Sequence, residues 1–142
     1  MPTSADPPDL LVDTSVAISL LVADHPDHDA THAAVGRRSL GLSGHAYFET
    51  SSVLTRLPGS LRRGPQEVAM LLRESFPKSR FLDAGESESL IVRFGDLEIA
   101  GGAVYDALVG HTAAVHGLAL VTRDARAIPI YRLLSVDLRV LN

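Results

Sequence analysis

Apolar residues fall into short runs that alternate with longer segments of helical periodicity. The run at residues 10–12 ends at Asp13, after which apolar positions 16, 18, 20 and 21 predict a helix. The same pattern predicts further strands at 39–43, 80–82, 118–121 and 138–141, and further helices at 28–35, 46–57, 65–76, 87–97 and 103–116. Strands that alternate with helices and lack hairpin turns are typical of a parallel sheet covered on both faces. We therefore expect a three-layer α/β/α fold with a central, mainly parallel sheet of about five strands.

The size and composition of the chain fit one domain. Its 142 residues, 46% of them hydrophobic, leave almost no room for a second domain, so we expect a single domain over 1–142. The first nine residues or so are expected to form a flexible N-terminal extension. The chain has no cysteine, which excludes disulfides, thiolate zinc sites and cysteine nucleophiles and is compatible with a reducing cytoplasm.

The sequence predicts a soluble, cytoplasmic protein that does not enter the membrane. The apolar stretch at 10–23 contains Asp13 and is shorter than the roughly 20 residues that a membrane helix needs. No Lys or Arg precedes Arg37, so the basic leader of a signal peptide is missing.

Charge is unevenly distributed along the chain. The net charge of -4 argues against a uniformly basic nucleic-acid binder. Between residues 37 and 80, however, eight basic residues stand against three acidic ones, a local balance of +5. This segment, with Arg62 and Arg63, either faces a polyanion or forms a solvated helical surface.

Four carboxylates are predicted to meet at one edge of the sheet. Asp13 and Asp124 each follow a predicted strand, while Glu49 and Asp106 lie in the first turns of predicted helices. The helix from Asp106 to residue 116 runs about 15 Å outward, and the strand that follows returns about 13 Å. Asp106 and Asp124 should therefore lie close together, at the edge where parallel α/β sheets bind ligands.

Four carboxylates at one edge repel one another unless a cation lies among them. Oxygen ligands without sulfur favour Mg²⁺, with Mn²⁺ as a possible substitute. Such a site can activate water and hold phosphate oxygens, which is the chemistry of metal-assisted nucleases. Each acid alone is equally compatible with a helix cap or a solvated turn, and their convergence is what favours a metal site.

Four segments together resemble a PIN domain of the VapC toxin family, and the resemblance runs from about residue 10 to the C-terminus. They are Leu-Val-Asp-Thr-Ser-Val at 11–16, Ala-Tyr-Phe-Glu-Thr-Ser-Ser-Val-Leu-Thr-Arg at 46–56, Tyr-Asp-Ala-Leu at 105–108 and Leu-Ala-Leu-Val-Thr-Arg-Asp at 118–124. The resemblance implies a Mg²⁺- or Mn²⁺-dependent endoribonuclease, the toxin of a type II toxin–antitoxin pair. It also implies a homodimer, a cognate VapB-like antitoxin, and RNA products with 5′-phosphate and 3′-hydroxyl ends.

The resemblance also assigns roles to residues of this chain. It implies an acidic catalytic site made of Asp13, Glu49, Asp106 and Asp124, with Asp13 and Asp106 as the foremost metal ligands and Asp124 and Glu49 as possible further ones. Thr14, Ser15 and Thr122 are expected to support the site with their hydroxyl groups. Arg123 either contacts substrate phosphate or pairs with a nearby acid, and we favour the second reading slightly.

Several alternatives use the same residues. His25, His28 and His32 have a spacing that can place them on one helix face, as a metal site or as an exposed polar face. A haloacid-dehalogenase-like phosphatase needs a second acid where Ser15 stands, and the chain has no Gly-rich nucleotide-binding fingerprint. Two functional alternatives stay open: a PIN-like binding or regulatory module with little catalysis, and a PIN nuclease of RNA processing outside a toxin–antitoxin pair.

Overall fold

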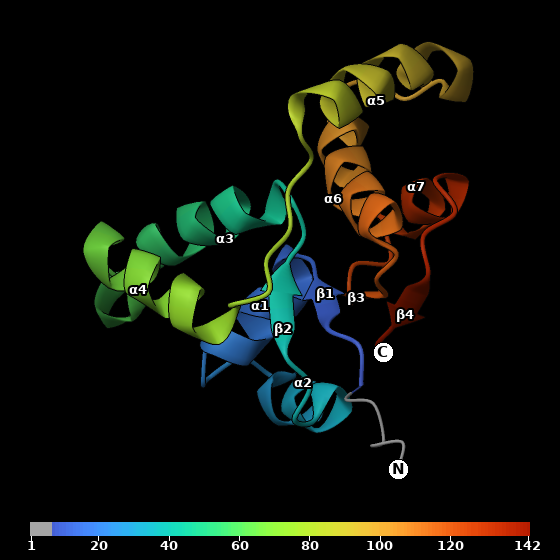
Figure 1. Cartoon of the computed structure of the whole chain (residues 1–142). Coiled ribbons are helices and arrows are strands. Elements are labelled where there is room, and N and C mark those ends of the chain that lie inside the picture. Colours follow the sequence, from blue (N-terminus) through green and yellow to red (C-terminus); the bar gives the residue numbers. More distant parts are fainter. Residues whose placement is uncertain (1–6) are drawn as a thin grey trace.

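A four-stranded parallel sheet forms the centre of the computed structural model, which describes residues 7–142 (Figure 1). The strands are β1 (Leu10–Val12), β2 (Leu40–Leu42), β3 (Leu120–Thr122) and β4 (Leu138–Val140), in the order β2-β1-β3-β4. The residues of β1 and β3 are all buried, as expected for parallel strands with helices on both faces. The predicted three-layer α/β/α fold is confirmed.

The helices cover the sheet in two groups. The helical segments are α1 (Thr14–Leu21), α2 (His28–Val35), α3 (Ala46–Thr55), the short 3-10 helix η1 (Gly59–Leu61), α4 (Pro65–Ser75), α5 (Ala84–Leu97), α6 (Ala103–His116) and α7 (Ile128–Leu133). Helix α1 packs against α2 and α3, and α3 packs against α4. Helix α6 packs against α7, and α5 lies across the end of α6 (Figure 1).

The strand expected at 80–82 is not regular, so the sheet has four strands rather than five in the part of the chain described. Residues 78–80 do run along β2, where Lys78 and Arg80 donate backbone hydrogen bonds to Leu40 and Leu42. The N–H of Leu42, however, donates to the Ser79 hydroxyl instead of a backbone carbonyl. The ladder is therefore reduced to a single bridge between Ser43 and Arg80.

Three helical features were missed from the sequence, namely the start of α5, the short 3-10 helix η1 and helix α7. Helix α5 begins three residues before the predicted start, because Asp83 and Glu86 form a reciprocal capping box at 83–86. Helix α7 was not predicted at all, since it has six residues and carries Pro129 in its first turn. This short helix nevertheless brings Tyr131 to the acidic edge of the sheet.

The expected N-terminal extension lies partly outside the described residues, which begin at residue 7. Arg38 donates two hydrogen bonds to the carbonyl of Pro8, and Arg80 forms an ion pair with Asp9 at 3.4 Å.

Among residues 7–142, no helix combines the length and apolar character needed to cross a bilayer.

Gly95 offers a test of the helical assignment of α5. It lies inside the helix, and an added Cβ would have no neighbour within 4 Å. Replacing Gly95 with Ala should raise the free energy of unfolding by about 0.5–1 kcal/mol, because alanine loses less backbone entropy in a helix. Urea denaturation monitored by circular dichroism measures this change, and a clear loss of stability would contradict the packing described for α5.

Candidate active site

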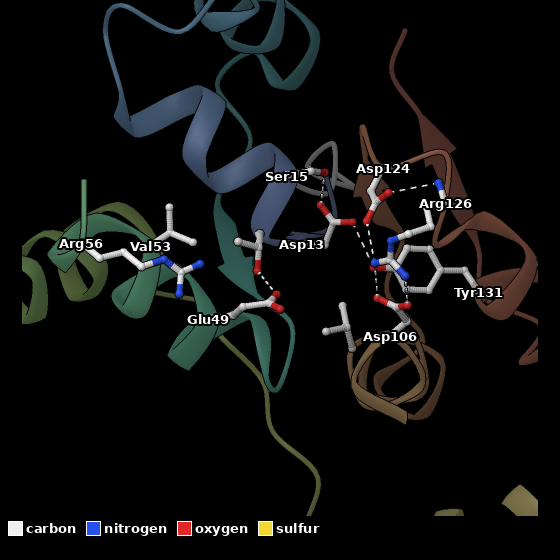
Figure 2. A pocket seen from close by; sticks show the side chains of 11 residues that line it. Asp13, Ser15, Glu49, Val53, Arg56, Asp106, Asp124, Arg126 and Tyr131 are labelled. Atoms are coloured by element: carbon white, nitrogen blue, oxygen red, sulfur yellow. Dashed lines mark hydrogen bonds and ion pairs between the residues drawn. The ribbon is translucent and has the colours of Figure 1, made fainter. Parts of the chain in front are cut away.

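The four carboxylates predicted from the sequence line one pocket of about 240 Å³ at the carboxyl ends of β1 and β3. Figure 2 shows Asp13 between two groups, with Glu49 of α3 on one side and Asp106 and Asp124 on the other. The pocket is lined by Asp13, Thr14, Ser15, Glu49, Val53, Arg56, Asp106, Val109, Asp124, Arg126 and Tyr131. The predicted convergence of acids is therefore present in the fold.

Asp13 is the buried centre of the pocket, with 4% of its surface exposed. Its carboxylate accepts hydrogen bonds from the hydroxyls of Ser15 and Thr122, both at 2.5 Å, and from Tyr131 at 3.0 Å. It also caps α1 by accepting from the backbone N–H of Val16. Burial raises the pKa of Asp13, while these hydrogen bonds act in the opposite direction. Asp13 is thus held in one orientation by three elements.

Glu49 lies in the first turn of α3, at the positive end of the helix dipole. One oxygen of its carboxylate accepts a hydrogen bond of 2.6 Å from the Thr14 hydroxyl. Thr14 begins α1, so this bond joins the first turn of α1 to α3 across the mouth of the pocket. Thr14 therefore orients Glu49, a supporting position like the one expected for it.

Asp106 and Asp124 share one arginine. Arg126 binds both oxygens of Asp106, at 2.8 and 3.1 Å, and one oxygen of Asp124 at 3.0 Å (Figure 2). These two carboxylates raise the pKa of the Arg126 guanidinium above its ordinary value, first through the hydrogen bonds that Arg126 donates to Asp106. Arg126 thus sets one positive charge against the two acids that lie on the α6 and β3 side of the pocket.

Two hydroxyls order the turn after β3. Thr122 accepts a hydrogen bond from the backbone N–H of Asp124 at 3.0 Å while donating to Asp13. Ser15 accepts from the backbone N–H of Arg123 at 2.9 Å while it donates to Asp13. Each hydroxyl therefore ties the turn to Asp13.

The arginines considered from the sequence lie elsewhere. The Arg123 side chain is 8% exposed and donates to the Thr31 hydroxyl and the carbonyl of Asn142, so it turns away from the pocket. Its contacts fit the structural reading rather than contact with substrate. Arg62 donates to the carbonyl of Leu57, Arg63 pairs with Glu67, and neither lines the acidic pocket.

Three polar residues that line the pocket had no assigned role in the sequence analysis, namely Arg56, Arg126 and Tyr131. Arg56 ends the motif around Glu49 and belongs to the basic segment, but it was given no role in the site. Arg126 stands two residues after Asp124, a position that the strand-end argument did not examine. Tyr131 required α7, which no sequence signal had indicated.

The three spaced histidines make contacts of their own. His28 and His32 hydrogen-bond the carbonyls of Ser19 and Leu20, at the end of α1. Nδ1 of His25 accepts from the backbone N–H of Asp27. One ring nitrogen of each histidine thus binds the backbone, and the bonds of His28 and His32 tie α2 to α1. Within residues 7–142, these histidines do not belong to a group of side chains placed to hold a metal ion.

The donor chemistry of the pocket suits a hard divalent cation. Its charged oxygen ligands are four carboxylates, and hydroxyls surround them, as Mg²⁺ and Mn²⁺ prefer. Within residues 7–142, no three His, Cys, Asp or Glu side chains stand close enough together to hold an ion. The reason is visible in the contacts: Arg126 holds Asp106 and Asp124, and three hydroxyls hold Asp13.

Comparison with known proteins agrees with this geometry. The PIN domain family matches residues 10–133. Ribonuclease VapC27 of Mycobacterium tuberculosis is 49% identical over 94% of this chain and 97% of its own length. Ribonuclease VapC40 of the same species is 38% identical over 92% of this chain and 97% of its own length.

Two solved structures share the fold. The structure of VapBC2 from Rickettsia felis, bound to a DNA fragment from its promoter, matches with a TM-score of 0.66. That match covers 94% of this chain and 98% of the other at 12% identity. FitAcB from Neisseria gonorrhoeae matches with a TM-score of 0.60 at 16% identity, covering 91% and 95%. With its sheet order, its pocket and these relatives together, the chain belongs to the PIN domain family, in the group of the VapC proteins.

Proposed function

We propose that this protein is a divalent-metal-dependent endoribonuclease that acts as the toxin of a VapBC-type toxin–antitoxin pair. The observation that carries the proposal is the convergence of Asp13, Glu49, Asp106 and Asp124 on one pocket of a PIN domain chain. The names of the VapC ribonucleases at 49% and 38% identity support RNA as the substrate. Hydrolysis of an RNA phosphodiester would leave 5′-phosphate and 3′-hydroxyl ends.

The chain's own residues prepare the site for this reaction. Asp13 and Asp106 would hold Mg²⁺, or Mn²⁺ in its place, with help from Glu49 and Asp124. A bound ion of this kind supplies an activated water and neutralises charge on the phosphate. Ser15, Thr122 and Tyr131 orient Asp13, so its carboxylate does not need to reorganise during the reaction.

Arg56 is the arginine best placed to meet the RNA backbone. It lines the pocket beside Glu49, and its guanidinium donates to the Ser52 hydroxyl without an ion pair to any residue in 7–142. A guanidinium with free donors binds phosphate oxygens well. Arg62 and Arg63 lie outside the pocket and would meet only more distant parts of a long RNA.

The partners proposed from the family are a VapB-like antitoxin and a second copy of this chain. Complexes named VapBC2 and FitAcB have this fold, which supports an antitoxin partner. Phe48 is 65% exposed and forms a surface aromatic cluster with Tyr47 and Phe81, which supports a protein contact at that face rather than a place in the core. We place the protein in the cytoplasm, because a chain without cysteine is compatible with a reducing compartment.

The proposal is tested by incubating the purified protein with a panel of structured RNAs. Cleavage is expected with Mg²⁺ or Mn²⁺ and is expected to fall to background with EDTA, because the acids cannot approach phosphate without a cation. Mapping the product ends checks the expected 5′-phosphate and 3′-hydroxyl.

Two outcomes favour the alternatives. Cleavage that continues unchanged in EDTA contradicts a metal-dependent nuclease. If cleavage requires metal but expression in cells does not arrest growth, and a co-expressed antitoxin from the adjacent gene does not bind, the protein is an RNA-processing nuclease outside a toxin–antitoxin pair. Tight partner binding without cleavage of any RNA favours a binding module.

A further inference from the structure

Arg126 binds two of the four carboxylates that the proposed function assigns to a metal ion. Its guanidinium forms three hydrogen bonds, and these engage both oxygens of Asp106 and Oδ2 of Asp124. A carboxylate oxygen that accepts from a guanidinium in this way is not free to coordinate a cation at the same angle. The two carboxylates therefore already have a counter-ion supplied by the chain itself.

The two acids need such a counter-ion. The Asp106 side chain is 14% exposed and that of Asp124 is 32% exposed, so water screens their mutual repulsion only partly. An arginine between them offsets part of this repulsion when no metal is present. A divalent cation would do the same with twice the charge.

Arg126, unlike the neighbouring Arg123, is free to leave. The Arg126 side chain is 69% exposed at the rim of the pocket, whereas the guanidinium of Arg123 is buried among fixed partners. Rotation into solvent would leave no cavity and would keep the guanidinium charge in water. The backbone N–H of Arg126 still donates to Oδ1 of Asp124, so this carboxylate stays oriented after the side chain has moved.

We propose that Arg126 is a resident counter-ion of the acidic pocket, which has to release Asp106 and Asp124 before a divalent cation binds there. The inference rests on the proposed function, because it assumes that these acids are metal ligands. Its consequence is that Arg126 lowers the apparent affinity for metal: part of the binding free energy is used to displace it. The same residue protects the fold when metal is scarce.

The test is a calorimetric titration of metal-free protein with Mn²⁺, performed on the wild type and on Arg126→Gln. The variant should bind Mn²⁺ on the order of tenfold more tightly, because one bidentate and one single ion pair no longer compete with the ion. In EDTA the variant should melt at a lower temperature than the wild type, and saturating Mn²⁺ should close this gap.

Arg56→Gln is the matched control, since Arg56 lines the same pocket but holds no carboxylate. An equal gain in affinity for both variants would mean a general charge effect and would overturn displacement, as would unchanged or weaker binding in Arg126→Gln. The variant Asp106→Asn distinguishes a failure of the displacement of Arg126 from a failure of the metal site itself. If neither the wild type nor Arg126→Gln binds Mn²⁺ and Asp106→Asn changes nothing, the metal site itself fails, and with it the proposed function.

Discussion

Replacing Asp13 with Asn is expected to lower RNA cleavage by about a thousandfold or more while the protein stays folded. The substitution removes the negative charge at the centre of the pocket and keeps the shape of the side chain. Asp13 is the only one of the four acids that is almost fully buried, so no other group can move into its place. Cleavage rates in Mg²⁺ measured over single turnovers check this result.

The fold should tolerate the change because the partners of Asp13 can adapt. The new amide can place its oxygen where Ser15 and the Val16 N–H donate, while the hydroxyls of Thr122 and Tyr131 rotate to accept from its NH₂ group. A loss of about 1–2 kcal/mol in unfolding free energy is therefore expected. Glu67→Gln, at an exposed ion pair outside the pocket, is the control and should cleave normally. A folded Asp13→Asn protein with full activity would show that the acidic pocket is not the catalytic site.

Replacing Gly41 with Ala should lower the free energy of unfolding by about 3 kcal/mol or more. This is the upper part of the range of losses seen when a side chain is enlarged in a packed core. A Cβ on Gly41 would lie 2.2 Å from the carbonyl oxygen of Lys78 and 2.6 Å from the backbone nitrogen of Ser79. Both atoms belong to the backbone beside β2, which cannot move without breaking the hydrogen bonds from Lys78 and Arg80. Urea denaturation of the variant measures the loss.

Gly64→Ala provides the comparison. An added Cβ at Gly64 meets nothing within 4 Å, so this variant should differ from the wild type by less than about 1 kcal/mol. Equal stability of Gly41→Ala and Gly64→Ala would show that residues 78–80 do not approach β2 as closely as described.

Local signals were sufficient for much of the fold. Helix α2 was expected at 28–35 and α6 at 103–116, and both have these bounds in the structure. For α6, Gly117 in the left-handed conformation ends the helix, as its place after His116 had indicated. The prediction of a strand at 80–82 was wrong, because regular pairing there depends on β2, which lies about forty residues earlier in the chain. The Ser79 hydroxyl accepts the hydrogen bond from the backbone N–H of Leu42. No local sequence pattern indicates this contact.

The sequence by itself determined the α/β layering and the position of four acids at strand and helix ends, because both follow from hydrophobic period and spacing along the chain. The tertiary structure alone decided which charges pair inside the pocket. Tyr131 reaches Asp13 across 118 positions, and Arg126 joins Asp106 to Asp124 across a helix and a strand. Such contacts depend on side-chain direction and on the distance between elements, and these exist only once the sheet has brought the elements together.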